Sequence, residues 1–412
     1  MEPVKENYDV IIVGGGPSGS ACAIFLGRQG HDVLLVDKAK FPRDKACGDG
    51  ITGRSKAILQ ELNLVEEVEK NPHAVYDGAI LYIGGQKLDV DFEEWFGHVS
   101  RRMVFDNIIF QEAKKLADTI EGFTVTGVIF EDKKVVGIKG IDLNTKEERS
   151  FRAKIVVGAD GANSVVAREV GLNEFKPNHH SSALRIYYKN IKDLSKKLEI
   201  YFIENQKLGI IPGYFWIFPL ENGTANVGVG MSTNSIQKYK VNLQDLLFKE
   251  IKTNPLLVDR FKDAEVVEGS LRGWNLPIVT ARRKMYGDGF VLLGDAASLI
   301  DPFTGEGIGP GLVSAKVASG FISDGLKKGD YSGRMLKKYQ DEMWRLYVRS
   351  YLKYHLLSKI AGNFKWLIKR AFKKFANDND FKQLVTMAFS DTEKRRKFTV
   401  WIAMKLLFKA IF

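Results

Sequence analysis

The chain has 412 residues, of which 45% are hydrophobic and 27% charged, and it carries a net charge of +11. The length exceeds one ordinary hydrophobic core and predicts two or three structural units, while the composition is typical of a soluble globular protein. Two cysteines exclude a disulfide framework, and six histidines without a spaced cluster indicate no metal site.

The positive charge is unevenly distributed. Residues 331–412 hold 19 Lys+Arg and 6 Asp+Glu, a net +13, so the first 330 residues hold 42 and 44, a net −2. A nucleic-acid enzyme more often spreads positive charge around its cleft, so we expect a basic C-terminal module and no nucleic-acid partner. Residues 1–9 lack the basic-then-apolar order of a signal peptide, which predicts a cytoplasmic protein.

Residues 8–37 have the order strand, glycine-rich turn, helix, strand and acid. An apolar run, residues 10–13, ends at the first of three glycines, Gly14, Gly16 and Gly19. In this pattern the first glycine permits a tight turn, the second lets a pyrophosphate approach the backbone, and the third lets the helix pack on the strand. Asp37 ends the second strand, where it would accept hydrogen bonds from a ribose. The stretch therefore predicts a dinucleotide site.

Further elements follow in chain order. The pattern predicts a Pro- and Gly-rich loop with Cys47, then a helix, and then a hairpin over 77–92 around Gly84-Gly85. A second helix is expected to start at Arg101-Arg102, followed by strands over 123–130 and 135–142. A buried strand over 154–157 then leads into Gly-Ala-Asp-Gly. Residues 175–276 alternate or are β-branched and aromatic, which favours a separate antiparallel sheet interrupted by a helix near 243–251. The first pattern returns at 289–293.

The nucleotide-binding domain is therefore predicted to be discontinuous. We assign residues 1–75, 97–175 and 277–330 to it, residues 76–96 and 176–276 to an inserted antiparallel sheet domain that binds substrate, and residues 331–412 to a C-terminal helical basic module. The fold class expected is α/β, with a Rossmann-like domain, an inserted antiparallel sheet and a helical C-terminal region.

Taken together, residues 8–325 resemble the FAD-dependent oxidoreductases of the para-hydroxybenzoate hydroxylase fold, and within them the geranylgeranyl reductase family. Four stretches besides the glycine-rich loop carry the resemblance: Arg102-Met-Val-Phe105-Asp106, Ala159-Asp160-Gly161, Gly294-Asp295-Ala296-Ala297, and Tyr214-Phe-Trp216-Ile-Phe218-Pro219 followed by Gly228-Val-Gly230. The resemblance implies that Arg102 contacts FAD, that Asp295 meets the ribityl chain, and that residues 302–308 lie beside the flavin ring.

The resemblance and the glycine pattern together give a set of expected FAD-binding residues. They are Gly14, Gly16, Pro17, Ser18, Gly19, Asp37, Lys38, Ala46, Cys47, Gly48, Gly50, Arg102, Val125, Asp160, Gly161, Gly294, Asp295, Pro302, Gly305, Gly307 and Ile308. A second strand-glycine-helix unit for a nicotinamide is not found in the sequence. We therefore expect electrons from a transiently docked NAD(P)H or from a ferredoxin-like protein.

The aromatic stretch predicts the substrate site. Tyr214, Trp216 and Phe218 are spaced by two on a strand, so their side chains share one face. Gly228 and Gly230 on the returning strand lack side chains that would fill the space opposite, which favours an aromatic slot for a long apolar chain. The alternative is an ordinary aromatic cross-strand core, and the accompanying flavin motifs favour the slot.

Cys47, Tyr214 and Trp216 are the candidate catalytic residues. Cys47 lies in a stretch similar to the family's Cys-Gly loop beside the isoalloxazine, so it is expected to contact flavin or substrate, and its role in proton transfer stays open. Cys22 is interpreted as a small apolar filler. Tyr214 or an ordered water are the other candidate proton donors.

Three carboxylates lie near these loops. Asp49 and Asp301 are expected to be solvated loop residues. Glu306 stands between two glycines where the family loop often has only small residues, and the direction of its effect on local polarity is left open.

The C-terminal region has two basic, apolar segments. Residues 363–376 place apolar and basic side chains on opposite sides of a helix, and residues 394–412 form an apolar run shorter than the ~20 residues that span a bilayer. These features favour peripheral binding at the inner face of the membrane, and the alternative is a helical bundle with an ordinary solvated face.

The predicted function is FAD-dependent saturation of C=C bonds in isoprenoid chains of lipids or prenyl compounds. A diether lipid, a chlorophyll-type tail and a menaquinone side chain all suit the slot. The alternatives are a flavin monooxygenase or halogenase of the same fold, and a non-catalytic prenyl-binding module.

Overall fold

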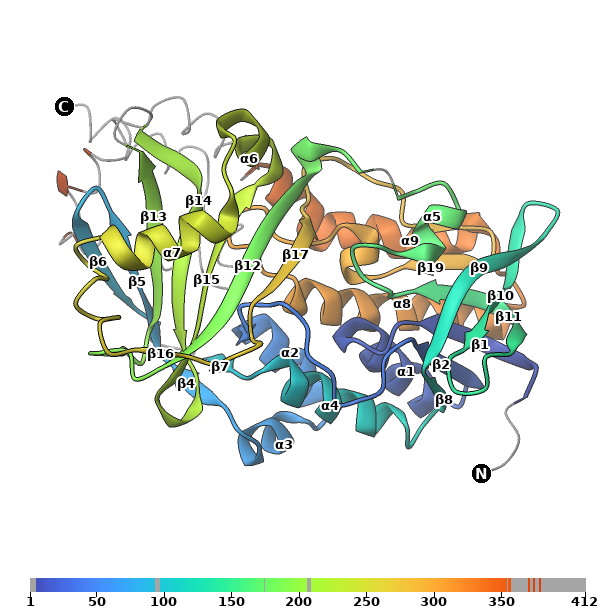
Figure 1. Ribbon diagram of the computed structural model, residues 1–412. Coiled ribbons are helices and arrows are strands. Elements are labelled where there is room, and N and C mark those ends of the chain that lie inside the picture. Colours follow the sequence, from blue (N-terminus) through green and yellow to red (C-terminus); the bar gives the residue numbers. More distant parts are fainter. Residues whose placement is uncertain are drawn as a thin grey trace.

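A computed structural model describes residues 5–92, 97–173, 175–205 and 209–353, together with residues 355, 356, 370, 373, 374 and 378. Two large β-sheets lie side by side, each with helices packed on it (Figure 1). Most of the predicted basic segments of the C-terminal module lie outside the described residues.

The first sheet is built around β1 (Asn7–Val13), which pairs in parallel with β2 and β11. The strand order is β18 (Tyr286–Gly287), β19 (Phe290–Leu292), β11 (Glu148–Gly158), β1, β2 (Val33–Asp37) and β8 (Asp118–Glu121), with β10 (Lys134–Asp142) pairing β11 and β9 (Phe123–Glu131) antiparallel. β1, β2 and β19 are short apolar runs because both faces of this part of the sheet are covered.

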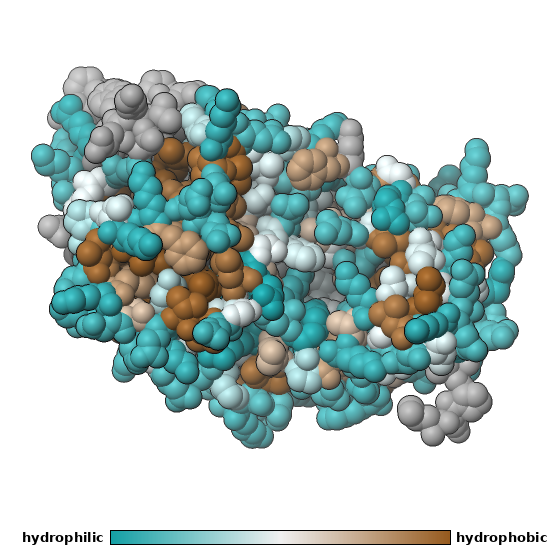
Figure 2. Space-filling model, in the orientation of Figure 1, coloured by the Kyte–Doolittle hydropathy of each residue, from teal (hydrophilic) through white to brown (hydrophobic). Residues whose placement is uncertain are grey.

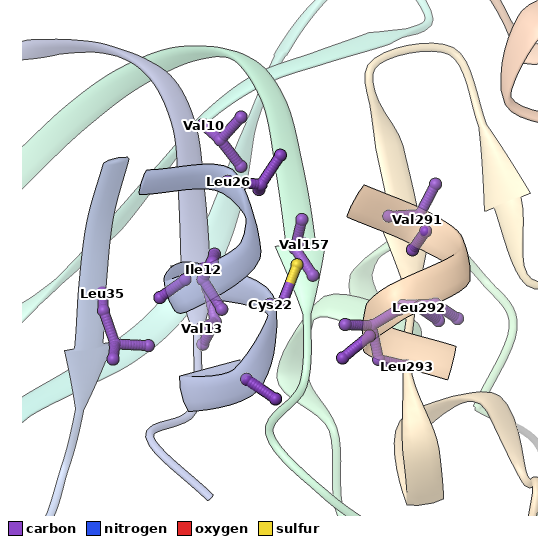
Figure 3. Packing of buried hydrophobic residues seen from close by; sticks show 14 of the residues in the cluster. Val10, Ile12, Val13, Cys22, Leu26, Leu35, Val157, Val291, Leu292 and Leu293 are labelled. Carbon is purple, nitrogen blue, oxygen red and sulfur yellow. The ribbon is translucent and has the colours of Figure 1, made fainter. Parts of the chain in front are cut away.

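Helices from three parts of the chain complete this half of the molecule. α1 (Pro17–Arg28) packs against α4 (Arg102–Ala113) and α8 (Ile308–Lys328), and α9 (Gly333–Met343) packs on α8 and continues into a π-helical turn, Trp344–Val348. Figure 3 shows the core beneath α1, where Cys22 lies beside Val157 of β11. Burial raises the pKa of Cys22 to about 12, and its interpretation as an apolar filler is confirmed.

The second sheet contains strands from two distant parts of the chain. Its order is β16 (Glu265–Val266), β12 (His180–Lys189), β15 (Thr224–Ser232), β14 (Gly209–Pro219), β13 (Leu198–Asn205), β5 (Gly78–Ile83) and β6 (Gln86–Asp91), with β17 (Arg272–Pro277) also on β12. β5 and β6 form the predicted hairpin, with positive φ at Gly84 and Gly85, and β5 joins the sheet by parallel pairing with β13.

Successive side chains of β14 point to opposite faces of the sheet, one of which packs in a core while the other lines a cavity. Phe215 and Ile217 lie in the core that α7 (Leu243–Thr253) covers. This helix is the one predicted near residues 243–251. The intervening Tyr214, Trp216 and Phe218 face the opposite side, toward the first half of the molecule. α6 (Thr233–Tyr239) packs on β12 and β15. Figure 2 shows apolar side chains gathered on the outer surface of this half.

A small third sheet connects the two halves, and the sequence pattern did not reveal it. It consists of β3 (Gly50–Ile51), β7 (Gly97–Val99) and β4 (Ala74–Tyr76). The helices α2 (Gly53–Glu61) and α3 (Val65–Lys70) lie between β3 and β4 in the chain. α5 (Val165–Glu169) lies beside β9 and β11. The predicted fold class is confirmed. In the described part of the chain, each helix is too short or too polar to cross a membrane.

Candidate active site

One cavity of about 1060 Å³ lies between the two large sheets. Loops of the first half line one side of it, and strands β12 to β15 of the second half line the other. Pockets for a single small molecule commonly measure about 300–1,000 Å³. This cavity therefore lies at the upper end of that range.

The glycine-rich turn borders this cavity at the N-terminus of α1. A Cβ atom on Gly14, which has φ +105°, would lie 2.4 Å from the carbonyl oxygen of Ala159, and one on Gly19 would lie 1.8 Å from the carbonyl oxygen of Gly14. These two glycines therefore allow close backbone packing. At Gly16 the nearest atom to such a Cβ is Arg43 Nη2 at 3.5 Å, so the turn is open to an anion at the helix N-terminus. Pro17 and Ser18 line the cavity beside it.

The carboxylate of Asp37 is held at the end of β2 by the backbone. Its Oδ2 accepts a hydrogen bond from the Gly15 N–H at 2.7 Å, and its Oδ1 accepts one from the Ala39 N–H at 2.7 Å. Each oxygen keeps a second lone pair that a ribose hydroxyl would use. The neighbouring Lys38 is exposed and does not line the cavity.

The second flavin motif approaches the glycine-rich turn through very small residues. Cβ atoms on Gly294 and Gly311 would lie 2.6 and 2.4 Å from Ser18 Oγ, so only glycines let these segments come together. Asp295 then enters the cavity wall, with its Oδ2 3.8 Å from Lys45 Nζ. Burial lowers the pKa of Lys45. Pro302, Gly305, Gly307 and Ile308 also line the cavity.

Arg102 is fixed in the wall by a buried carboxylate. Its Nε and Nη2 donate to Asp106 at 2.6 and 2.7 Å, and Arg43 adds a third hydrogen bond to Asp106 at 2.7 Å. Burial acts to raise the pKa of Asp106, but these two arginines hold it below its usual value. The Cys47 thiol faces Arg102; burial raises the pKa of Cys47, and Arg102 offsets this only in part.

Seven of the expected cofactor residues are not part of the cavity lining, namely Gly14, Gly19, Asp37, Lys38, Val125, Asp160 and Gly294. Asp160 accepts hydrogen bonds from Ser164 Oγ and from the Val165 N–H, so its carboxylate caps the start of α5 while Gly161 lines the cavity. Burial raises the pKa of Asp160. Val125 is a buried residue of β9 paired with Gly140 of β10.

The aromatic side chains of β14 form a continuous wall. The ring centroids of Tyr214 and Trp216 are 5.9 Å apart, and those of Trp216 and Phe218 are 6.1 Å apart. Gly228 pairs with Trp216, and a Cβ on it would lie 2.1 Å from the indole, so Gly228 makes room for the ring itself. Gly230 leaves 3.7 Å to the indole and lines the cavity. Both glycines were expected to leave open space opposite the aromatic side chains, and only Gly230 does so.

The hydroxyl of Tyr214 connects this wall to the loop after β19. It donates a hydrogen bond of 2.8 Å to the carbonyl oxygen of Thr304, and burial raises the pKa of Tyr214. Both effects disfavour loss of its proton to a ligand.

Asp49, expected to be solvated, is fully buried, and that expectation is wrong. Its Oδ2 accepts hydrogen bonds from Tyr187 Oη at 2.7 Å and from Asn226 Nδ2 at 2.8 Å. Burial raises the pKa of Asp49 to about 6, although Arg185 acts to lower it. The sequence pattern missed Asn226, and its one available signal was an amide inside an otherwise apolar strand.

Asp301 is also fully buried, which corrects the same expectation. Arg54 Nη2 lies 3.1 Å from Glu306 Oε2 and 3.7 Å from Asp301 Oδ2, and its Nη1 donates to Tyr351 Oη at 2.6 Å. Thr52 donates to Glu306 as well. Arg54, a residue that the sequence pattern did not single out, is therefore shared between the carboxylates of Glu306 and Asp301.

An open glycine turn at a helix N-terminus, an oriented acid at the end of the next strand and a second motif packed against the turn fit an FAD-binding flavoprotein. The chain matches the family described as FAD binding domain over residues 7–344. It is 32% identical over 371 residues to a digeranylgeranylglycerophospholipid reductase of Thermoplasma volcanium, covering 86% of this chain and 89% of that protein. The chain belongs to the geranylgeranyl reductase family of FAD-dependent oxidoreductases.

Other known proteins are similar in sequence or in structure. A menaquinone reductase of Mycobacterium tuberculosis is 30% identical over 328 residues, covering 77% of this chain and 76% of that protein. The crystal structure of a geranylgeranyl bacteriochlorophyll reductase-like protein from Thermoplasma acidophilum is 28% identical, with a TM-score of 0.76 and coverage of 98% and 96%. The flavin-dependent brominase Bmp2, 22% identical with a TM-score of 0.77 and 98% coverage of both chains, shares the fold.

Proposed function

We propose that this protein saturates carbon–carbon double bonds in the isoprenoid chain of a lipid or prenyl compound. The observation that carries the proposal is that Tyr214, Trp216 and Phe218 line the same cavity as the glycine turn and the loop 302–308. An isoprenoid chain offers almost no hydrogen-bonding groups, so apolar area and shape must hold it. The aromatic wall supplies both, directly across from the proposed flavin-binding loops.

The proposed division of labour follows from the side chains. Bound FAD, once reduced, supplies a hydride for one alkene carbon. Gly16, Asp37 and Asp295 would hold the cofactor, with Arg102 beside it. The aromatic wall would exclude water and hold the alkene in place, which matters because an isolated alkene is a poor hydride acceptor.

The second alkene carbon needs a proton, and Cys47 is the best supported donor. Cys47 lines the cavity, and desolvation of the thiol raises its pKa, so the proton remains on Sγ at neutral pH. Tyr214 is less suitable, because its hydroxyl proton is shared with the Thr304 carbonyl. Trp216 is proposed to act by holding the chain.

The names of the relatives guide the choice of substrate. One relative is named for a phospholipid with geranylgeranyl chains and another for menaquinone, and both of these molecules carry isoprenoid chains. We include both classes in the proposal. The electron donor is proposed to be NAD(P)H or a ferredoxin-like protein, and the basic C-terminal segments are proposed to bring the enzyme to the inner membrane surface, where such lipids reside.

Anaerobic turnover tests the function. The purified protein is loaded with FAD, reduced chemically with dithionite and incubated with digeranylgeranylglyceryl phosphate or with menaquinone. The masses of the products are then measured by mass spectrometry. The expected product gains two hydrogens for each double bond reduced. An unchanged lipid mass with both substrates would reject the proposal.

A flavin monooxygenase or halogenase is the second candidate, because the fold is shared with a flavin-dependent brominase. Such an enzyme consumes oxygen, or oxygen and halide, and would be inactive without oxygen. A protein purified without FAD that also fails to bind added FAD would instead favour the prenyl-binding module.

A further inference from the structure

A buried amide connects the two walls of the cavity. Asn226 of β15 is fully buried, and its Oδ1 accepts a hydrogen bond from Trp216 Nε1 at 2.9 Å. Its Nδ2 donates to the carbonyl oxygen of Cys47 at 2.8 Å and to Asp49 Oδ2 at 2.8 Å. Three hydrogen bonds thus join the aromatic strand to the loop that bears the candidate proton donor.

The chemistry of the partners permits only one orientation of this amide. An indole N–H can only donate, so it must face the amide oxygen, and a carbonyl oxygen can only accept, so it must face the amide nitrogen. Both amide hydrogens are used, and flipping the group would break all three contacts. A residue with a single polar atom cannot replace Asn226 in this role.

Asp49 anchors the other end of this arrangement. It has φ +62°, and its Oδ2 also accepts from Tyr187 of β12, whose ring lies 4.2 Å from the Arg185 guanidinium. Its Oδ1 is buried without a hydrogen-bond partner among the described residues. Burying a carboxyl group in this way is unfavourable unless its partners hold it. Asp49 therefore fixes the turn after Cys47 only while Asn226 and Tyr187 remain in place.

The two walls also approach each other closely at this point. A Cβ on Gly48 would lie 3.1 Å from the Phe218 ring and 3.9 Å from Trp216 Nε1. At Gly48 there is thus little room for a side chain between the Cys47 loop and the aromatic wall, and the amide of Asn226 bridges the two beside it.

We propose that Asn226, oriented by Asp49, is a positioning residue that holds the Cys47 loop and the Trp216 indole at the spacing needed for an alkene to reach the thiol. This inference rests on the proposed reductase function. It assigns Asn226 no contact with the reacting atoms, and it predicts that losing the amide changes turnover and thiol access more than substrate binding.

The first test uses the thiol and needs no catalysis. In the protein as purified, Asn226→Leu removes three hydrogen bonds at nearly constant volume, so the Cys47 loop detaches more often. The rate of Cys47 alkylation by iodoacetamide, followed by peptide mass spectrometry, is expected to rise roughly tenfold. Cys22, fully buried in the core, serves as the internal reference.

The control is Gln340→Met. Gln340 is also buried, and its Oε1 accepts a hydrogen bond from the Met285 N–H at 3.1 Å, but it does not line the cavity. Loss of this amide is expected to lower the melting temperature without changing Cys47 alkylation. If both variants alkylate Cys47 at the wild-type rate, or if both accelerate it equally at matched loss of stability, the positioning role is wrong.

The second test uses turnover and an exchange of the two side chains. Asn226→Leu is expected to lower kcat roughly 10- to 100-fold with KM changed less than about threefold. In Asn226→Asp the carboxylate still accepts from the indole but has no donor for Cys47 or Asp49. Adding Asp49→Asn restores a donor between residues 49 and 226, so the double variant is expected to recover part of the kcat that Asn226→Asp alone loses. If Asn226→Asp and the double variant Asn226→Asp with Asp49→Asn have equal kcat, the proposal is overturned. If the wild type reduces no isoprenoid chain, the function fails and the alkylation test still decides the positioning role.

Discussion

The hydroxyl of Tyr214 lies 2.8 Å from the carbonyl oxygen of Thr304, 90 residues further along the chain. This hydrogen bond joins the aromatic wall to the loop that is proposed to lie beside the flavin. Its removal in Tyr214→Phe is expected to destabilise the protein by about 1 kcal/mol and to lower kcat less than tenfold, because the proton was already engaged by Thr304. Thermal unfolding and turnover with chemically reduced FAD measure the two effects. A loss of kcat beyond a hundredfold would instead identify Tyr214 as the acid.

Cys47 gives the opposite prediction. Cys47→Ala removes the proposed proton donor, and its kcat is expected to fall about 10²- to 10⁴-fold while FAD binding, followed by the flavin absorbance, stays near the wild-type level. Cys22→Ala is the matched control, because Cys22 lies in the core away from the cavity. If Cys47→Ala keeps normal turnover with reduced FAD, the proton comes from another group or from water.

Substitutions at Gly228 and Gly230 test two different properties, the packing of the Trp216 indole and the width of the slot. Gly228→Ala places a Cβ within 2.1 Å of the indole and is expected to displace Trp216, raising KM for the lipid and lowering the melting temperature. Gly230→Ala leaves ordinary contacts and is expected to change stability little while narrowing the slot. Substrate titrations and thermal unfolding of the two variants test this. Equal melting temperatures would contradict the arrangement of the indole over Gly228.

Asp49 predicts how stability depends on pH. Its pKa, raised to about 6 in the folded protein from an ordinary value near 3.8, means that the folded state binds the proton more tightly than the unfolded state. Its contribution to the free energy of unfolding is therefore fully present below about pH 4 and is lost as the pH rises to about 6. The loss is of order 1 to 3 kcal/mol.

Asp49→Asn tests this, because it has no proton to lose and tolerates the positive φ. Between pH 4 and 6.5, denaturant unfolding should show a smaller fall in stability for Asp49→Asn than for the wild type. Parallel curves for the two proteins would show that Asp49 does not titrate in this range.

Local patterns were sufficient for much of the fold. The apolar strand 10–13, the glycines after it and the acid at 37 lie within one continuous supersecondary unit, so their spacing already specifies their geometry. The face shared by Tyr214, Trp216 and Phe218 follows from the two-residue period of a strand. The hairpin at Gly84-Gly85 needed only a turn that accepts positive φ.

Other features depend on contacts between distant residues. Asp49 was expected to lie in a solvated loop, yet it is buried against Tyr187 and Asn226, which are 138 and 177 residues away in sequence. Glu306 acquires its partner from Arg54, and Asp160 is used to cap α5 rather than to face the cavity.

The sequence alone determined many of the strands and turns of the two large sheets and which side chains of β14 share a face, because these properties repeat over two to four residues. Only the tertiary structure decided which polar groups are buried, which wall Cys47 faces and what Gly228 accommodates. Burial and hydrogen bonding depend on which segments meet in space, and no local period encodes the partner that an amide on β15 finds in the loop after Cys47.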